Sequence, residues 1–194
     1  NNQTSILMLA LGLGTFLIAT LYIVQHALIS QVAIAGDNNR PNLVLVDVQT
    51  DQKEGVATLI QNQNLPLIHQ APVVTMRLSH IKGYPANTYQ KEFNVSRWSL
   101  SREYRSTYRN HIYDSETVIS GTWHNDTHNG DEPVPVSLEK SIAQNLKVTL
   151  GDTLTFNVQG IPIITIVQSL REVDWQRIQP NFFVVFPNGV LEPA

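Results

Sequence analysis

The sequence predicts an α+β fold that follows an N-terminal transmembrane and stalk helix. The first 36 of the 194 residues contain no Lys, Arg, Asp or Glu. Beyond them, short segments that alternate like strands are interspersed with segments of helical periodicity. These segments lack the regular spacing of βαβ units, which favours an α+β arrangement over a doubly wound parallel sheet.

Composition limits the number of domains and the kinds of partner. A chain of 194 residues, 42% of them hydrophobic, can bury one core, so we expect one compact domain plus an appendage. The 13 Lys and Arg and 16 Asp and Glu give a net charge of −3, so no basic surface for nucleic acid is expected. The absence of cysteine excludes disulfides, thiolate nucleophiles and cysteine-bound zinc.

The nearly uninterrupted apolar stretch at residues 6–24 predicts a membrane span. A helix needs about 20 such residues to cross about 30 Å of hydrocarbon. The alternatives are a buried core helix and a cleaved signal peptide. A core helix rarely continues so far without charge, and the basic start and small-residue cleavage site of a signal peptide are missing here. Neither flank is basic, so charge does not indicate the orientation of the span.

The helix is predicted to continue past the membrane to about residue 35. Val24, Leu28 and Val32 extend an apolar stripe with a spacing of four, while Gln25, His26, Ser30 and Gln31 between them are polar. A helix from residue 6 to residue 35 would be about 45 Å long, so about 15 Å would project beyond the hydrocarbon.

Gly36 is expected to end this helix, which places the predicted domain boundary there. The sequence thus predicts a transmembrane and stalk helix at 1–36 and a core domain at 37–194. Within the span, Ala10 and Gly14 form a small-xxx-small pair that would let a second helix approach closely.

The first part of the core domain carries strand and helix signals in turn. Residues 43–48 are apolar and rich in β-branched side chains, which predicts a strand. Asp51 and Glu54 have the spacing of a capping box, so a helix is expected to begin there. Residues 71–81 predict the next strand, and 82–85 predict a turn.

The second part of the core domain contains the clearest periodic segments. Residues 116–121 predict a strand. Ser137 is expected to cap a helix in which Leu138, Ile142 and Leu146 are spaced by four.

A hairpin and a last strand complete the predicted fold. The alternation at 154–158 predicts one strand, Gly160 a turn, and the apolar residues at 161–166 the returning strand. Residues 181–186 predict the final strand.

Arginines and tyrosines are mixed between residues 98 and 113. Such a mixture can stack nucleic acid bases, but the nearby acids and the overall charge argue against that function. We favour a half-exposed segment in which arginine stems and tyrosine rings cover the edge of the core, with cation–π contacts among them. The residues concerned are Arg102, Arg105, Arg109, Tyr104, Tyr108 and Tyr113.

Motifs for nucleotide binding and serine hydrolysis are absent from the sequence. Neither the Walker A pattern nor the dinucleotide glycine fingerprint occurs, so nucleotide binding is not expected. Ser120 precedes Gly121, but the Gly-x-Ser-x-Gly pattern that exposes a serine nucleophile is missing.

One cluster of potential metal ligands lies between residues 123 and 132. His124 and His128 are four residues apart, with Asp126, Asp131 and Glu132 close by. Imidazole and carboxylate groups can hold zinc, but the Asn and Gly residues here indicate a loop, so the spacing implies no shared helical face. A solvated polar loop is favoured, and no catalytic, cofactor-binding or metal residue is predicted.

The C-terminal third carries a pattern that resembles a known family of permeases. The pattern consists of Ser137-Leu138-Glu139 opening a helix with Ala143 and Leu146, then Leu150-Gly151-Asp152-Thr153-Leu154-Thr155-Phe156, then Gly160 and a strand that continues to Ser169-Leu170-Arg171. It resembles ABC transporter permeases of the FtsX-like, MacB-type superfamily.

A second set of residues, spread over nearly the whole chain, is more specific. The set is Arg40-Pro41-Asn42-Leu43, Asp47-Val48-Gln49-Thr50-Asp51-Gln52, Arg102-Glu103-Tyr104, Thr107-Tyr108, Val173-Asp174-Trp175 and Pro180-Asn181-Phe182-Phe183. It resembles the YbbP-like predicted permeases.

This resemblance implies a permease whose transmembrane helix leads into a periplasmic, MacB-like core domain at 37–194. Further transmembrane helices would follow, in the bacterial inner membrane. A separate cytoplasmic ABC ATPase would hydrolyse ATP, and the stalk would transmit its motion outward, a process called mechanotransmission. A stiff helix that overshoots the membrane, which the apolar pattern predicts independently, suits that role.

The resemblance also implies a periplasmic esterase or hydrolase as partner, and export or extraction of a hydrophobic or lipid-like compound. The chain is shorter than the larger efflux members, so docking to an outer adaptor is not expected. An interaction module that activates a periplasmic hydrolase is the alternative hypothesis. A metal-dependent enzyme that uses His124 and His128 is a third.

Overall fold

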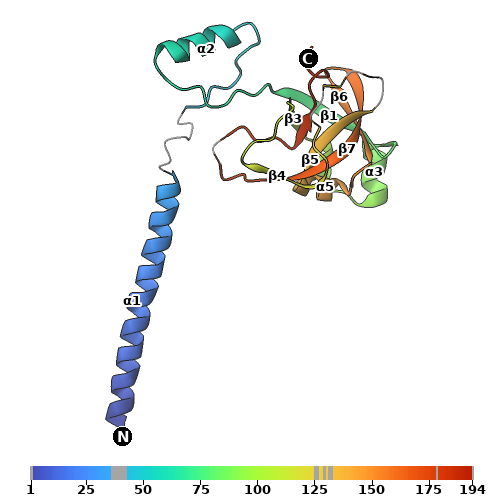
Figure 1. Ribbon diagram of the computed structural model, residues 1–194. Helices are drawn as coiled ribbons and strands as arrows, with labels where there is room; N and C mark the ends of the chain where they lie inside the picture. The colour runs from blue at the N-terminus through green and yellow to red at the C-terminus, as the bar shows by residue number, and fades with distance from the viewer. Residues whose placement is uncertain are drawn as a thin grey trace. The chain divides into compact units, whose positions relative to one another are not determined.

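A computed structural model describes residues 2–35, 43–124, 127–128, 130, 133–177 and 179–193, although for 31–35 it describes the backbone alone. The chain divides into two compact units, Asn1–Ile68 and His69–Ala194 (Figure 1).

The first unit contains the predicted N-terminal helix and one further helix. Helix α1 (Asn2–Ala35) is continuous over 34 residues, which confirms the prediction of a long apolar helix. Helix α2 (Lys53–Asn62) lies where a helix was expected, but the predicted capping box is wrong. Gln52 is the N-cap residue, and its side chain caps no helical N–H. The carbonyl of Gln49 already accepts from the N–H groups of Gln52 and Lys53, so the turn begins before Asp51.

The strand predicted at 43–48 is also wrong. These residues carry no strand assignment, and Leu43, Val44 and Val46 are 62%, 55% and 76% exposed. A β-type composition produces a strand only where a second strand completes the hydrogen bonds, and no described strand pairs with this segment.

The second unit is built from eight strands and three short helices among the described residues. The strands are β1 (Val74–Ile81), β2 (Tyr84–Pro85), β3 (Glu103–Tyr108), β4 (Glu116–Gly121), β5 (Val134–Glu139), β6 (Thr153–Val158), β7 (Ile161–Val173) and β8 (Val184–Phe186). The helices are α3 (Ala86–Phe93), α4 (Arg97–Ser101) and α5 (Lys140–Leu146). This mixture confirms the predicted α+β class.

The strand pairing closes six of these strands into a ring. The order around it is β1, β3, β8, β5, β7, β6 and back to β1. The pairs β3–β8 and β5–β7 are parallel, and the other four are antiparallel. Strand β4 adds to the C-terminal half of β7, and β2 adds to β1. Closure leaves these six strands without a free edge along the paired stretches.

A hydrophobic core ties the ring together across long distances in sequence. The Tyr104, Phe156 and Phe186 side chains come from β3, β6 and β8 and are at most 1% exposed. Their rings meet edge to face at centroid distances of 5.9 Å on both sides of Phe156. Aromatic pairs in this geometry add about 0.5–1.5 kcal/mol each beyond the burial of apolar area.

The two predicted turns are confirmed. Lys82 and Gly83 join β1 to β2 with φ values of 52° and 82°, and Gln159 and Gly160 join β6 to β7 with 50° and 95°. Two consecutive residues at positive φ are typical of a type I′ turn, whose twist matches that of the flanking strands.

The helix predicted to begin at Ser137 begins instead at Lys140. Ser137 and Leu138 belong to β5 because they pair with β7 on one side and β8 on the other. The Glu139 carboxylate caps the helix by accepting from the Ile142 N–H at 3.1 Å. Ile142 and Leu146 are buried as expected.

Several boundaries also differ from the expected ones. Strands β1 and β8 begin three residues later than predicted. Strand β7 continues to Val173, past residue 166, where the hairpin pattern ended, and close to Arg171, where the strand of the family pattern ended. Helices α3 and α4 had no clear signal in the sequence.

Candidate functional site

Helix α1 has the length and composition of a membrane-spanning helix. Its first 29 residues, Asn2–Ser30, are apolar enough to cross a bilayer, and none of their side chains is buried within the chain. Leu9, Phe16 and Leu21 are 76%, 65% and 69% exposed. A continuous apolar surface of this kind is stable against lipid or other helices rather than against water.

The hydroxyl groups on α1 are compatible with a lipid environment. Thr15, Thr20 and Ser30 each donate a hydrogen bond to a carbonyl of the preceding turn, at 2.8–3.0 Å. Their polar atoms therefore do not need water, which removes most of the cost of placing them in hydrocarbon.

The second unit contains a buried polar layer in addition to its hydrophobic core. In β8, Val184 and Phe186 belong to the core, so the side chain of Val185 points to the opposite face of the sheet. On that face, Val185 lies opposite Thr107 of β3 and Ser137 of β5. Ser169 of β7 lies opposite Ser137 on the other side of β5. All four residues, Val185, Thr107, Ser137 and Ser169, are fully buried.

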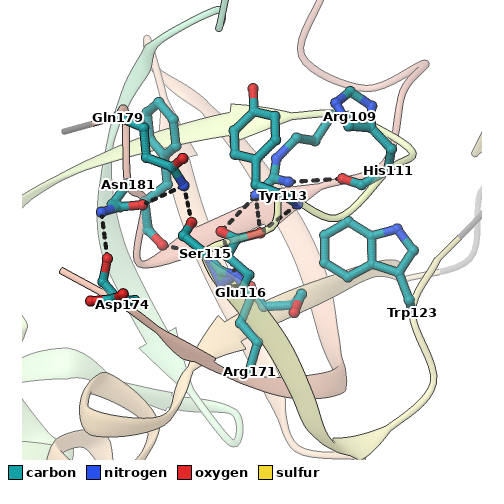
Figure 2. A network of polar contacts seen from close by, with 12 residues as sticks. Arg109, His111, Tyr113, Ser115, Glu116, Trp123, Arg171, Asp174, Gln179 and Asn181 are labelled. Carbon is teal, nitrogen blue, oxygen red and sulfur yellow. Dashed lines mark hydrogen bonds and ion pairs between the residues drawn. The ribbon is translucent and has the colours of Figure 1, made fainter. Parts of the chain in front are cut away.

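The carboxylate of Glu116 is the centre of this buried polar layer. Its side chain is fully buried, and both of its oxygens accept from Nη2 of Arg109, at 2.7 and 2.6 Å (Figure 2). Nε of Arg171 approaches the same carboxylate at 3.3 Å. The backbone N–H of Tyr113 donates to it at 3.4 Å. One carboxylate thus connects the end of β3, the start of β4 and the C-terminal half of β7.

Arg109 is held by contacts on several sides. Its Nη1 donates to the carbonyl of His111 at 2.8 Å. Its guanidinium carbon lies 3.9 Å from the centre of the Tyr113 ring and 5.5 Å from that of Trp123. These contacts confirm the predicted cation–π interactions. The expectation of a half-exposed segment is wrong for Arg109 and Tyr104, which are 5% and 0% exposed.

Arg171 is the largest fully buried side chain of the described chain. Besides Glu116, it donates to the carbonyl oxygens of Phe182 and Ser137. Burial lowers the pKa of its guanidinium to about 10, against the opposing effects of Glu116 and Glu139. The buried Glu139 and Glu116 together balance the charges of Arg109 and Arg171.

His124 packs against this layer as a neutral imidazole. It is 4% exposed, and its Nε2 lies 3.2 Å from the carbonyl of Arg109, so this nitrogen carries the proton and donates. Burial lowers the pKa of His124 to about 4, and the charges of Arg109 and Arg171 act in the same direction. The Trp123 ring stacks on the imidazole at 4.3 Å.

The segment after β7 is fastened to the same layer by side-chain amides. The Gln179 amide donates to the hydroxyl of Ser115, and the Asn181 amide donates to the Asp174 carbonyl at 3.4 Å (Figure 2). The Asp174 N–H donates to the Ser115 carbonyl at 2.8 Å.

This geometry supports a structural role for the buried layer. The Glu116 carboxylate already accepts from two arginines and one backbone N–H, and its side chain is inaccessible to substrate. A saturated, buried carboxylate is poorly suited to act as a general base. What the layer does is hold β3, β4, β7 and the C-terminal segment in one arrangement.

The structure separates the metal-ligand candidates. His124 was expected on a solvated loop but is buried in the polar layer, whereas His128 is half-buried and donates its backbone N–H to the Asn188 carbonyl at 2.9 Å. Asp126, Asp131 and Glu132 lie outside the described residues. In the part of the chain that is described, no three His, Asp or Glu side chains gather closely enough to hold a metal ion.

Ser120 is half-buried on β4, opposite Leu170 of β7, and therefore sits within a regular strand.

Sequence reasoning did not identify Glu116 and Arg171 as partners. The available signal was the alternation of buried residues along β7, in which Arg171 follows Val167 and Ser169 and precedes Val173, all of them buried.

Replacing Glu116 by glutamine is expected to destabilise the second unit by about 3–5 kcal/mol, because two buried guanidinium groups would lose their shared counter-charge. Urea unfolding of the chain in detergent, followed by tryptophan fluorescence, measures the loss. The matched control is Glu103→Gln, which breaks an exposed pair with Arg77 and should cost less than about 1 kcal/mol. Equal effects of the two substitutions would contradict the role assigned to Glu116.

Acidification is expected to weaken the fold through His124. Its pKa is lower in the folded chain than the ordinary 6.5, so the unfolded chain binds the proton more readily. The contribution of the neutral imidazole is complete above about pH 6.5 and is lost as the pH falls to about 4, a change of up to about 3 kcal/mol.

The comparison of His124→Gln with the unmodified chain isolates this effect. The difference in unfolding free energy between the two proteins should shrink between pH 7 and pH 4.5. A difference that stays constant with pH would show that the pKa of His124 is the same in the folded and the unfolded chain, and would contradict this prediction.

Comparison with known proteins relates the chain to a transporter subunit. Over 183 residues, 94% of this chain, it is 30% identical to a protein of Escherichia coli (strain K12) described as "Uncharacterized ABC transporter permease YbbP". The matched part is 21% of that protein, so the chain spans about a fifth of its length. No protein-family model matches the chain, and neither does any solved structure.

This match confirms the resemblance to YbbP-like permeases, while the FtsX-like, MacB-type subtype stays a prediction. The chain is therefore YbbP-like, similar over nearly its whole length to one segment of an ABC transporter permease.

Proposed function

We propose that this chain is the membrane-anchored, extracytoplasmic part of an ABC transporter permease subunit. The observation that carries the proposal is the match to an ABC transporter permease along 94% of the chain. In this proposal, residues 1–36 cross the bacterial inner membrane and form a stalk, and residues 37–194 form a MacB-like core domain in the periplasm.

The length of α1 supports a role in transmitting motion. Its 34 residues extend about 51 Å, whereas the hydrocarbon is about 30 Å thick, so about 20 Å of helix is available outside it. A continuous helix displaces its far end as a rod does, whereas a flexible linker would absorb the movement. The closed strand ring of the second unit is suited to move as one body.

The chemistry of transport is assigned to other parts of the assembly. ATP hydrolysis is assigned to a separate cytoplasmic ATPase. The transport pathway is assigned to α1 together with the other transmembrane helices of the permease. We propose no catalytic role for this chain. The proposed cargo is a hydrophobic or lipid-like compound, with a periplasmic esterase or hydrolase as a partner, as the resemblance to YbbP-like permeases implies.

Placement of the second unit outside the cytoplasm can be tested by labelling single cysteines. The chain has no cysteine of its own. In a cysteine-free full-length permease, Ile161→Cys lies on the exposed β6–β7 hairpin and should react with a membrane-impermeant maleimide in cells with a permeabilised outer membrane. Gln3→Cys, at the other end of the span, should react only after lysis. The reverse pattern would refute the proposed orientation.

Coupling can be tested by breaking the stalk. Leu28→Pro interrupts α1 beyond its most apolar part, at a local cost of about 3 kcal/mol. In nanodiscs with the ATPase subunit, energy transfer between a dye at residue 161 and a headgroup dye should change on vanadate trapping. Leu28→Pro should abolish at least about half of this change while ATP hydrolysis continues.

The control is Thr58→Pro, which interrupts α2 instead of α1. It should leave the nucleotide-dependent signal intact. A full signal from Leu28→Pro would count against transmission through α1.

A further inference from the structure

An arginine of the second unit lies between aromatic rings at the protein surface. The guanidinium carbon of Arg102 is 4.2 Å from the centre of the Trp98 ring and 4.4 Å from that of Phe183. The Trp175 ring packs on Phe183 at 4.9 Å. These four side chains are called the arginine–aromatic row below.

Rigid parts of the fold hold the row in place. Trp98 belongs to α4, and Arg102 directly follows this helix and precedes β3. Phe183 precedes β8, and its carbonyl accepts from the Glu139 N–H at 2.8 Å. The hydroxyl of the fully buried Tyr104 donates to the Ser99 carbonyl and so fastens α4 to β3.

The two ends of the row are open to solvent. Trp98 is 55% exposed and Trp175 is 47% exposed. Large aromatic side chains at the surface are costly unless something covers them, and Trp, Tyr and Arg are the residue types enriched at the energetic centres of protein interfaces.

Arg102 also lacks the anion that a guanidinium in such surroundings requires. Its Nε and Nη1 atoms are buried, and neither has a hydrogen-bond partner among the described residues. The rings occupy the faces of the guanidinium, and because Nε and Nη1 are buried, an approaching anion would meet the group at Nη2, which is not among the buried unpartnered atoms. Among the described residues, Arg97, Arg102 and Arg105 pair with no carboxylate; Arg97 and Arg105 are exposed to water, whereas Arg102 has buried N–H groups.

We propose that the arginine–aromatic row is a protein-docking surface whose partner presents a carboxylate to Arg102 and apolar side chains to Trp98 and Trp175. A carboxylate at Nη2 would neutralise the guanidinium charge through a charge-assisted hydrogen bond. The exposed tryptophans lie at opposite ends of the row, so an extended surface is needed to cover them together. The net charge of −3 disfavours nucleic acid as the occupant. This assignment does not depend on the permease role.

Site-specific photo-cross-linking in the full-length permease, in its native membrane, tests the proposal. A benzophenone amino acid replaces Trp98 or Trp175 in separate experiments, and Ile161, which is 66% exposed and lies outside the row, is the control position. Positions 98 and 175 should cross-link to the same protein, within a segment that carries Asp or Glu. Position 161 should not give that product.

Arg102→Gln should lower the yield of this product by roughly tenfold, since it removes a charge from the centre of the interface. A charge swap then tests the contact directly. Arg102→Glu combined with arginine at the mapped acidic residue should restore the product, and either change alone should abolish it. An unfolding curve of the Arg102→Gln chain, monitored by tryptophan fluorescence, checks that this variant keeps its fold. Trp98→Ala is a second variant, at the exposed end of the row, and its effect is measured by cross-linking from position 175.

Three outcomes would overturn the proposal. The first is a product whose added mass is that of a lipid, and the second is a yield that does not change in Arg102→Gln. The third is the absence of protein products from both positions 98 and 175.

Discussion

The arrangement of the second unit depends on one carboxylate shared by two buried arginines. Glu116 binds Arg109, which lies 7 residues before it at the end of β3, and Arg171, which lies 55 residues after it in β7. Removing three charged groups from water costs several kcal/mol each, and mutual attraction offsets this cost only when each group has its partner. Alternative packings that separate the three groups are therefore strongly disfavoured, and the layer specifies one arrangement of the loops that cover it.

The buried layer and the closed ring support the transport proposal in complementary ways. The hydrophobic core, centred on Phe156, fixes the ring from within, and the polar layer fixes the opposite face of β3, β8, β5 and β7. A unit tied on both faces of its sheet deforms little, because packed interiors have low compressibility. Movement delivered to such a body reaches its surface, including the arginine–aromatic row, with little loss.

The sequence predicted those helices, turns and strands that are determined by residues close to one another in the chain. The apolar helix, the hairpin with its turn at Gly160 and the strand at 116–121 follow from composition and from residues within a few positions of one another. Ser137 was misassigned because its neighbours have helical spacing, whereas pairing with β7 and β8, tens of residues away, decides its state. The Glu116–Arg171 contact could not be predicted for the same reason. Alternation along a strand indicates that a residue is buried, but it does not indicate which residue it contacts.

The order in which the ring closes has a consequence for biogenesis. Strand β8 lies between β3 and β5, although it is the last described strand of the chain. Until residues 184–186 are available, β3 and β5 each present an unpaired edge, and such edges are prone to association with other chains. During synthesis from the N-terminus, both edges stay open from the time β5 is complete at residue 139 until residues 184–186 follow. Assembly of this unit is thus expected to be late and slow, and to benefit from a chaperone that shields extended chain segments.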